Sequence, residues 1–151
     1  GHAIGAGDRE GVGLAIGCGA SVTILVGAVC SVVLLATPAL VISAYTDDPD
    51  IHSTAAALVG LAALFIVIDA TQVTVTFCLR AFKDTSFPFY VLCGIYWFMT
   101  LPLGYYLGKV LADNAQDGAM GFWKSMIAGI ALSTGILLLR LRLTLARPLT
   151  A

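Results

Sequence analysis

Four long apolar stretches constrain this 151-residue chain more than any other feature. A helix needs about 20 apolar residues to cross the hydrocarbon layer of a membrane, and stretches of that order lie at about 12–44, 53–79, 88–107 and 122–139. Charged residues make up 11% of the chain, against about 25% in soluble domains. This composition excludes a soluble enzyme, a nucleic-acid-binding protein and a disordered tail. It predicts an all-α membrane protein with four transmembrane helices in the lipid bilayer.

The start of the chain and two prolines refine this prediction. Residues 1–11 are too polar for a signal peptide, and the first residue is not Met, so we expect a piece of a longer polytopic protein. Pro38 and Pro102 lie inside the first and third stretches. We expect Pro38 to kink its helix, which neighbouring helices can tolerate.

The basic residues are divided unevenly between the two sides that four spans define. Both chain ends and the middle connection share one side, and six of the eight Lys and Arg residues lie there. Because basic residues in short loops mark the cytoplasmic face, we expect both ends of this segment in the cytoplasm. This side carries Arg9, Arg80, Lys83, Arg140, Arg142 and Arg147, and the other carries Lys109, Lys124, Asp47, Asp48, Asp50, Asp113 and Asp117.

Asp69 lies near the centre of the second predicted span, deeper than any other titratable side chain. A carboxylate there costs about 2.5–3.5 kcal/mol on insertion scales. Gln72, Thr76 and Arg80 follow it at helical spacing, so one face of the helix is polar from mid-membrane to its cytoplasmic end. This pattern favours a water-accessible cavity and a site where a proton and a cation compete for one negative charge. The alternative is an interhelical hydrogen bond that holds a bundle together.

Four other side chains are candidates for lining such a cavity. Gln72 and Thr76 either line it or form hydrogen bonds to a neighbouring helix or the preceding backbone turn. Tyr96 and Trp97 lie midway along the third span. Because a Tyr hydroxyl within the membrane needs a partner, we expect this pair to face protein or a cavity. Arg80 is typical of an anchor at the membrane edge.

The cysteines and the small residues indicate helix packing. The four cysteines lie in or beside apolar stretches, without a Cys-x-x-Cys pair or a suitably spaced histidine, so we expect no metal site. Close helix contacts are predicted at three pairs of small residues four positions apart: Gly13 and Gly17, Gly104 and Gly108, and Gly129 and Ser133.

Several short motifs occur together in the order and spacing of a known family. They are Gly5-Ala6-Gly7-Asp8, Tyr45-Thr46-Asp47-Asp48-Pro49, Asp69-Ala70-Thr71-Gln72-Val73, Leu79-Arg80, Lys83-Asp84-Thr85, Tyr96-Trp97 and Pro102-Leu103-Gly104-Tyr105. Through these residues the chain resembles, essentially end to end, the multidrug and toxic compound extrusion (MATE) transporters, in particular the NorM-like branch of bacteria.

The resemblance implies a twelve-helix transporter, not an enzyme, in which two six-helix bundles enclose a central cleft. This chain would supply the last four helices, part of the second bundle, and the N-terminal bundle would be its partner. Such a protein uses no cofactor and expels organic cations, drugs and dyes among them, across the bacterial inner (plasma) membrane in exchange for sodium ions or protons. Asp69 matches an acidic residue of the tenth helix that belongs to a cation-binding site, so the resemblance implies a possible sodium site there.

The chain departs from this family at three positions, and other functions stay open. Ile66 stands where the family often has Gln, Ala81 where it often has Gly, and Phe65 where some members have a polar aromatic residue. Phe65 has no oxygen to offer a cation, which leaves the choice of ion open. One alternative function is a lipid-linked sugar flippase of the same superfamily, although no basic residue lies deep in a span. The other is a non-transport membrane scaffold in which Asp69 holds helices together.

Overall fold

The structure, a computed structural model, describes residues 5–44 and 49–146, and the side chains of the second range from residue 54 onward. Within these ranges every regular element is a helix, and four segments are long and apolar enough to cross a membrane. The expected all-α membrane fold with four transmembrane helices is therefore confirmed. Tyr45, Asp47, Asp48 and Arg147 lie outside the described residues, as does the side chain of Asp50.

Each span consists of one long helix or of several consecutive helical elements. In chain order they are α2 (Arg9–Ala36), α3 (Pro38–Ser43), α4 (Pro49–Ala81), α5 (Ser86–Ile95), η1 (Tyr96–Thr100), α6 (Leu101–Tyr105), η2 (Tyr106–Val110) and α7 (Ala115–Ala146), where η marks a π-helical segment. The third span runs without a break from α5 to η2.

Polar side chains cap two of the long helices. The Asp8 carboxylate accepts a hydrogen bond of 3.0 Å from the backbone N–H of Gly11 and begins α2. The Asn114 side chain accepts a bond of 2.9 Å from the Asp117 N–H and donates one of 2.8 Å to its carboxylate. Such caps satisfy amides that have no partner in the first turn. As a result α7 begins well before residue 122, where the apolar stretch starts.

The first span is interrupted at Thr37, immediately before Pro38. Thr37 has a non-helical backbone (φ −125°, ψ 41°), and α3 starts at the proline. A residue that precedes proline is disfavoured in the helical region because the proline ring crowds it. The kink expected at Pro38 is thus a break between two helices.

The third span contains two π-helical turns that hydropathy did not predict. The Leu101 N–H bonds to the Tyr96 carbonyl, and the Leu111 N–H bonds to the Tyr106 carbonyl, each five residues back. Pro102 follows the first turn and has no N–H to donate, and in regular α geometry its ring would crowd the carbonyl four residues earlier. Single π turns are a known way of accommodating such a local disruption within a helix.

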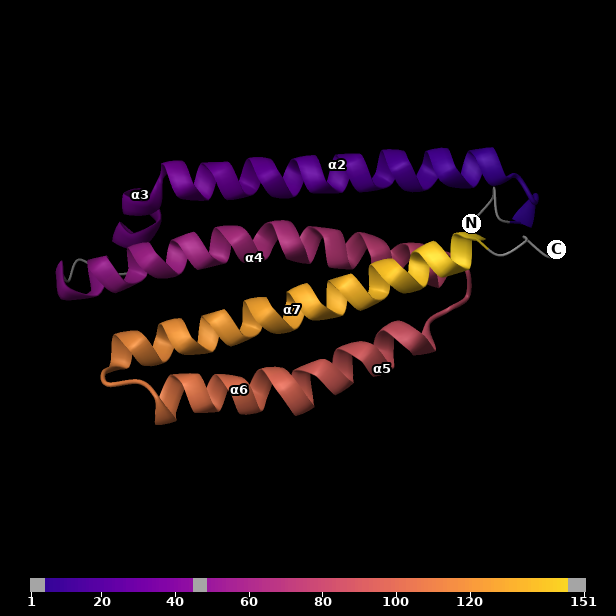
Figure 1. The fold of residues 1–151 in the computed structure, drawn as a ribbon. Coiled ribbons are helices and arrows are strands. Elements are labelled where there is room, and N and C mark those ends of the chain that lie inside the picture. The colour runs from indigo at the N-terminus through magenta and orange to yellow at the C-terminus, as the bar shows by residue number, and fades with distance from the viewer. Residues whose placement is uncertain (1–4, 45–48, 147–151) are drawn as a thin grey trace.

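Helix α7 lies between α4 and the helix formed by α5 to η2, although it follows both in the sequence (Figure 1). Helix α2 packs against the far side of α4. The start of α2, the α4–α5 turn and the end of α7 gather at one end of the bundle (Figure 1). A buried apolar cluster joins α4 to α7 near this end, formed by Val75, Leu79, Leu137 and Leu141.

Small residues allow close approach at two of the three predicted pairs. A Cβ on Gly104 would lie 2.8 Å from the Phe122 ring, and one on Gly129 would overlap the Thr100 side chain. Gly13 and Gly17 have no atom of another element within 4 Å of such a Cβ. The first pair therefore makes no close contact within the described residues, and α7 is the helix that gains most from its small residues.

Candidate functional site

A pocket of about 330 Å³ lies beside Asp69, between α4 and the third span. The polar face predicted on α4 lines it, because Asp69, Gln72, Thr76 and Arg80 all contribute to its wall. Leu92 of α5 and Tyr96 of η1 form the opposite side. The structure thus brings the predicted polar stripe together with one of the two predicted aromatic residues.

Asp69 is the acidic residue of this pocket. Its side chain is half-buried, and among the described residues its carboxylate makes no hydrogen bond or ion pair. Asp69 lies about 18 Å along the helix from the end of α4 at Ala81, as the rise of an α-helix requires. Among the described residues no cation neutralises this carboxylate, and an ionised carboxylate at this depth is costly to hold in a membrane.

Gln72 combines the two roles that the sequence left open. Its side chain is buried and lines the pocket, and its amide Nε2 donates a hydrogen bond of 2.7 Å to the Ser133 hydroxyl. Ser133 in turn donates to the Ile130 carbonyl at 3.0 Å. Gln72 therefore joins α4 to α7 at the wall of the pocket.

Thr76 and Arg80 continue the stripe toward the end of α4. The Thr76 hydroxyl donates to the Gln72 carbonyl at 2.8 Å, which is the local backbone bond that the sequence allowed. The Arg80 guanidinium lies 5.3 Å from the centre of the Phe77 ring, within range of a cation–π contact. Arg80 thus lies at the rim of the pocket as well as at the end of a span.

The two aromatic candidates of the third span separate. Tyr96 lines the pocket, whereas Trp97 lies outside it with 68% of its surface exposed. Neighbouring residues on a helix point about 100° apart, so a pair in sequence does not face one surface. Tyr96 is therefore the aromatic residue of this pocket, and a place for Trp97 beside protein or a cavity stays a prediction.

The contribution of α7 to the site was missed by sequence reasoning. Ser133 holds Gln72, and the Ser125 hydroxyl donates a 2.6 Å hydrogen bond to the Thr100 carbonyl in the π-helical segment that carries Tyr96. The spacing of Gly129 and Ser133 indicated a packing face, but the sequence could not tell which helix that face meets. Both walls of the pocket are therefore attached to α7.

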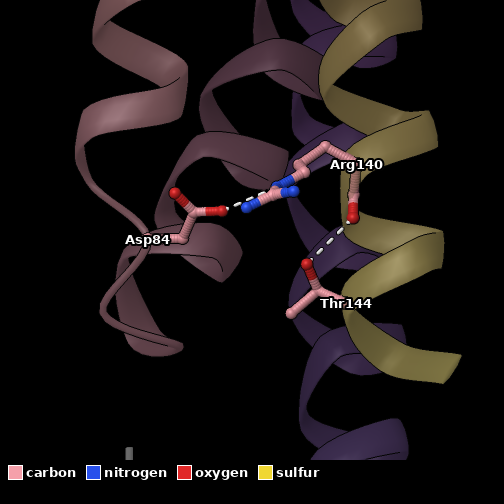
Figure 2. Close-up of polar contacts among 3 residues, drawn as sticks. All are labelled: Asp84, Arg140 and Thr144. Carbon is pink, nitrogen blue, oxygen red and sulfur yellow. Dashed lines mark hydrogen bonds and ion pairs between the residues drawn. The ribbon is translucent and has the colours of Figure 1, made fainter. Parts of the chain in front are cut away.

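A further tie to α7 joins the turn that connects the two walls. The Arg140 Nε donates to the Asp84 carboxylate at 2.8 Å, and the Arg140 guanidinium lies 4.8 Å from the centre of the Phe87 ring. Figure 2 shows Arg140 reaching from α7 to Asp84 in the α4–α5 turn, while its backbone carbonyl accepts a bond from Thr144. The distribution of basic residues in the sequence predicts only that Arg140 lies on the cytoplasmic side, and it does not indicate this ion pair.

Oxygen atoms are the donors that this pocket offers to a cation. Asp69, Gln72 and Tyr96 line the same space, and each of these side chains carries at least one oxygen atom. Hard cations such as sodium prefer oxygen donors of this kind. Asp69 supplies the one formal negative charge of the pocket, so a singly charged ion would neutralise it.

Comparison of the amino-acid sequence with known proteins identifies similar proteins. The MatE family model matches residues 1–106, about seven tenths of the chain. A probable multidrug resistance protein NorM from Idiomarina loihiensis is 42% identical over 100 residues, which is 66% of this chain and 22% of that protein. The multidrug resistance protein NorM of Aliivibrio fischeri is 31% identical over 141 residues, covering 93% of this chain and 31% of the relative. The multidrug resistance protein PmpM of Pseudomonas aeruginosa is 32% identical over 141 residues, with 93% and 30% covered. The chain thus spans less than a third of the length of these relatives.

Proposed function

The chain belongs to the MatE family, and from this membership and the pocket around Asp69 we propose that it forms part of a secondary multidrug exporter. The exporter would expel organic cations in antiport with sodium ions or protons. The names of the relatives, all multidrug resistance proteins, support the export of drugs. The single observation that carries the coupling role is a half-buried carboxylate at mid-membrane depth that lacks an ion-pair partner among the described residues.

Asp69 would couple the two fluxes through its charge. In its ionised form it attracts a proton or a cation, and once neutralised it no longer attracts a cationic drug. Neutralisation also removes the cost of holding a charge away from bulk water. Because the ion binds the two orientations of a transporter unequally, it shifts the equilibrium between them. Binding of the ion from outside the cell would thereby drive release of the drug to the outside.

The other residues of the pocket would hold Asp69 and its ion in place. Tyr96 and Gln72 would add neutral oxygens to the site, and the bond from Gln72 to Ser133 would keep α4 at a fixed distance from α7. Thr76 would line the path toward the end of α4. Trp97 lies outside this pocket and has no role in this proposal.

The remaining helices of the exporter would complete the cleft. Four apolar spans and bacterial relatives support a multi-pass protein of the inner membrane. We propose that both ends of this segment lie in the cytoplasm, because most basic residues fall on that side. We also propose that this segment forms the last four of twelve helices and that an N-terminal bundle faces it, which agrees with its share of the relatives' length.

The test is the substitution Asp69→Asn in the complete exporter. Asparagine keeps the size and one acceptor oxygen but cannot ionise, so drug efflux should fall to the background of cells without the exporter while membrane abundance stays unchanged. Asp113→Asn, which removes an exposed carboxylate outside the pocket, serves as the control and should retain efflux. Efflux should be measured under separate sodium and proton gradients, which also identifies the ion. Efflux by Asp69→Asn at the level of the control would refute the proposal.

A further inference from the structure

A second polar pocket, of about 460 Å³, lies where α4 ends and α5 begins. Arg80, Thr85, Ser86, Phe89 and Tyr90 line it. It shares Arg80 with the Asp69 pocket, but its other lining residues come from the turn and the first part of α5. Proposed ion coupling at Asp69 does not account for a polar pocket at this place.

Four of the five side chains that line this pocket are hydrogen-bond donors, and none of the four has a hydrogen-bond partner within the described part of the chain. Among the described residues, the hydroxyls of Thr85, Ser86 and Tyr90 make no hydrogen bond, and the Arg80 guanidinium has no carboxylate partner. The Phe77 ring lies beside the guanidinium. One guanidinium and three hydroxyls around one space match the chemistry of a phosphate group, which offers only acceptors and a negative charge.

The described charges around the pocket are positive because the acidic residue that precedes Thr85 in the sequence is paired with an arginine of α7. Asp84 precedes Thr85 in the turn, but its carboxylate is paired with Arg140 at 2.8 Å (Figure 2). Lys83, in the same turn, is exposed. The charges of Arg80 and Lys83 are therefore not cancelled by Asp84, and no carboxylate lines the pocket.

The position of the pocket at the end of two spans favours the phosphate of a lipid headgroup over free inorganic phosphate. It lies at the ends of two spans, where lipid headgroups are found, and Phe89 and Tyr90 beside it are 61% and 71% exposed. Their rings form an edge-to-face pair with centroids 5.6 Å apart, typical of aromatic residues at the membrane interface. Basic pockets between transmembrane helices bind anionic headgroups. We propose that this pocket binds the phosphate of an anionic phospholipid, with its apolar chains against the exposed apolar surface near Phe89.

The proposal can be tested by native mass spectrometry of the complete, purified exporter titrated with phosphatidylglycerol or phosphatidylcholine. The unmodified protein should retain phosphatidylglycerol in preference to phosphatidylcholine. Arg80→Gln should weaken phosphatidylglycerol binding about fivefold, as expected for one basic residue near a charged headgroup. Arg142→Gln removes an exposed arginine near the same end of the bundle, outside the pocket, and should leave binding unchanged.

A second variant and a second ligand complete the test. Tyr90→Phe keeps every charge and removes one hydroxyl, so it should weaken binding by a smaller factor than Arg80→Gln. Inorganic phosphate at the same concentration should compete poorly, because it lacks the apolar chains. Equal loss of lipid in the Arg80 and Arg142 variants would overturn the proposal, as would inorganic phosphate that displaces the lipid at equal concentration.

Discussion

Gly129 of α7 faces the Thr100 side chain so closely that no Cβ fits between the two helices. We expect Gly129→Ala to destabilise the protein by about 1–3 kcal/mol, because overpacking forces side chains and backbone to shift. Gly135 provides a matched control on the same helix, since a Cβ there would have no neighbour within 4 Å. Thermal unfolding of the purified exporter should give a lower midpoint for Gly129→Ala than for Gly135→Ala. Equal midpoints would contradict this account of the interface.

A single functional residue could be predicted from the sequence where its side chain is costly to place inside the membrane. Asp69 stood out because a carboxylate at bilayer depth is expensive, and the spacing of Gln72, Thr76 and Arg80 correctly placed these residues on one face of α4. The partner of Gln72 was not predictable, because Ser133 lies 61 positions later in the sequence. A periodic pattern reports which face of a helix is polar, but it does not report which helix lies opposite.

The α4–α5 turn is joined to α7 by the Asp84–Arg140 ion pair, whose side chains are only 18% and 31% exposed. A double-mutant cycle of Asp84→Asn and Arg140→Gln should give a coupling energy of about 1 kcal/mol, near the upper end for pairs at a surface. Arg140→Gln should cost more than Asp84→Asn, because it also removes the contact with the Phe87 ring. Unfolding of the complete exporter by denaturant measures these values.

The control for this cycle pairs Asp84→Asn with Arg142→Gln. Arg142 is exposed and makes no ion pair with Asp84. The two substitutions should therefore have additive effects. A coupling energy as large as that of Asp84 with Arg140 would show that the effect is not specific to the observed pair.

The sequence predicts the four helices themselves, but it does not predict the break and the π turns within them. Apolar length alone predicts four spanning helices, and Pro38 and Pro102 mark where regular geometry is disturbed. The outcome differs between the two prolines, since Pro38 starts a new helix after a break whereas Pro102 follows a π turn within a continuous span. Hydropathy carries no information on hydrogen-bond register, and so the π turn that presents Tyr96 to the pocket was not foreseen.

At the scale of the whole molecule, the distribution of charge predicts which connections face the cytoplasm. In a cysteine-free background, Asp113→Cys in the connection before α7 should react with an impermeant thiol reagent in intact cells. Lys83→Cys in the α4–α5 turn should react only after the membrane is permeabilised. Both side chains are exposed in the structure, so a difference in labelling would reflect the side of the membrane and not burial. The reverse pattern would contradict the proposed orientation.

The order of the helices in space was beyond sequence reasoning, although it shapes the candidate site. Hydropathy predicts how many spans exist, and short connections suggest that consecutive spans are neighbours. Here α4 and α5 are joined by a short turn, yet α7 lies between α4 and the rest of the third span (Figure 1). That arrangement depends on buried contacts such as those of Gly129 and Ser133, which exist only once the chain has folded.

The central place of α7 also has a consequence for biosynthesis. Helices α4 and α5 are synthesised before α7. The two walls of the Asp69 pocket therefore cannot reach their final packing until α7 has inserted between them. The nascent hairpin therefore needs to stay open enough to admit that helix, and a ribosome that stalls ahead of it would leave an immature chain whose carboxylate has no finished enclosure.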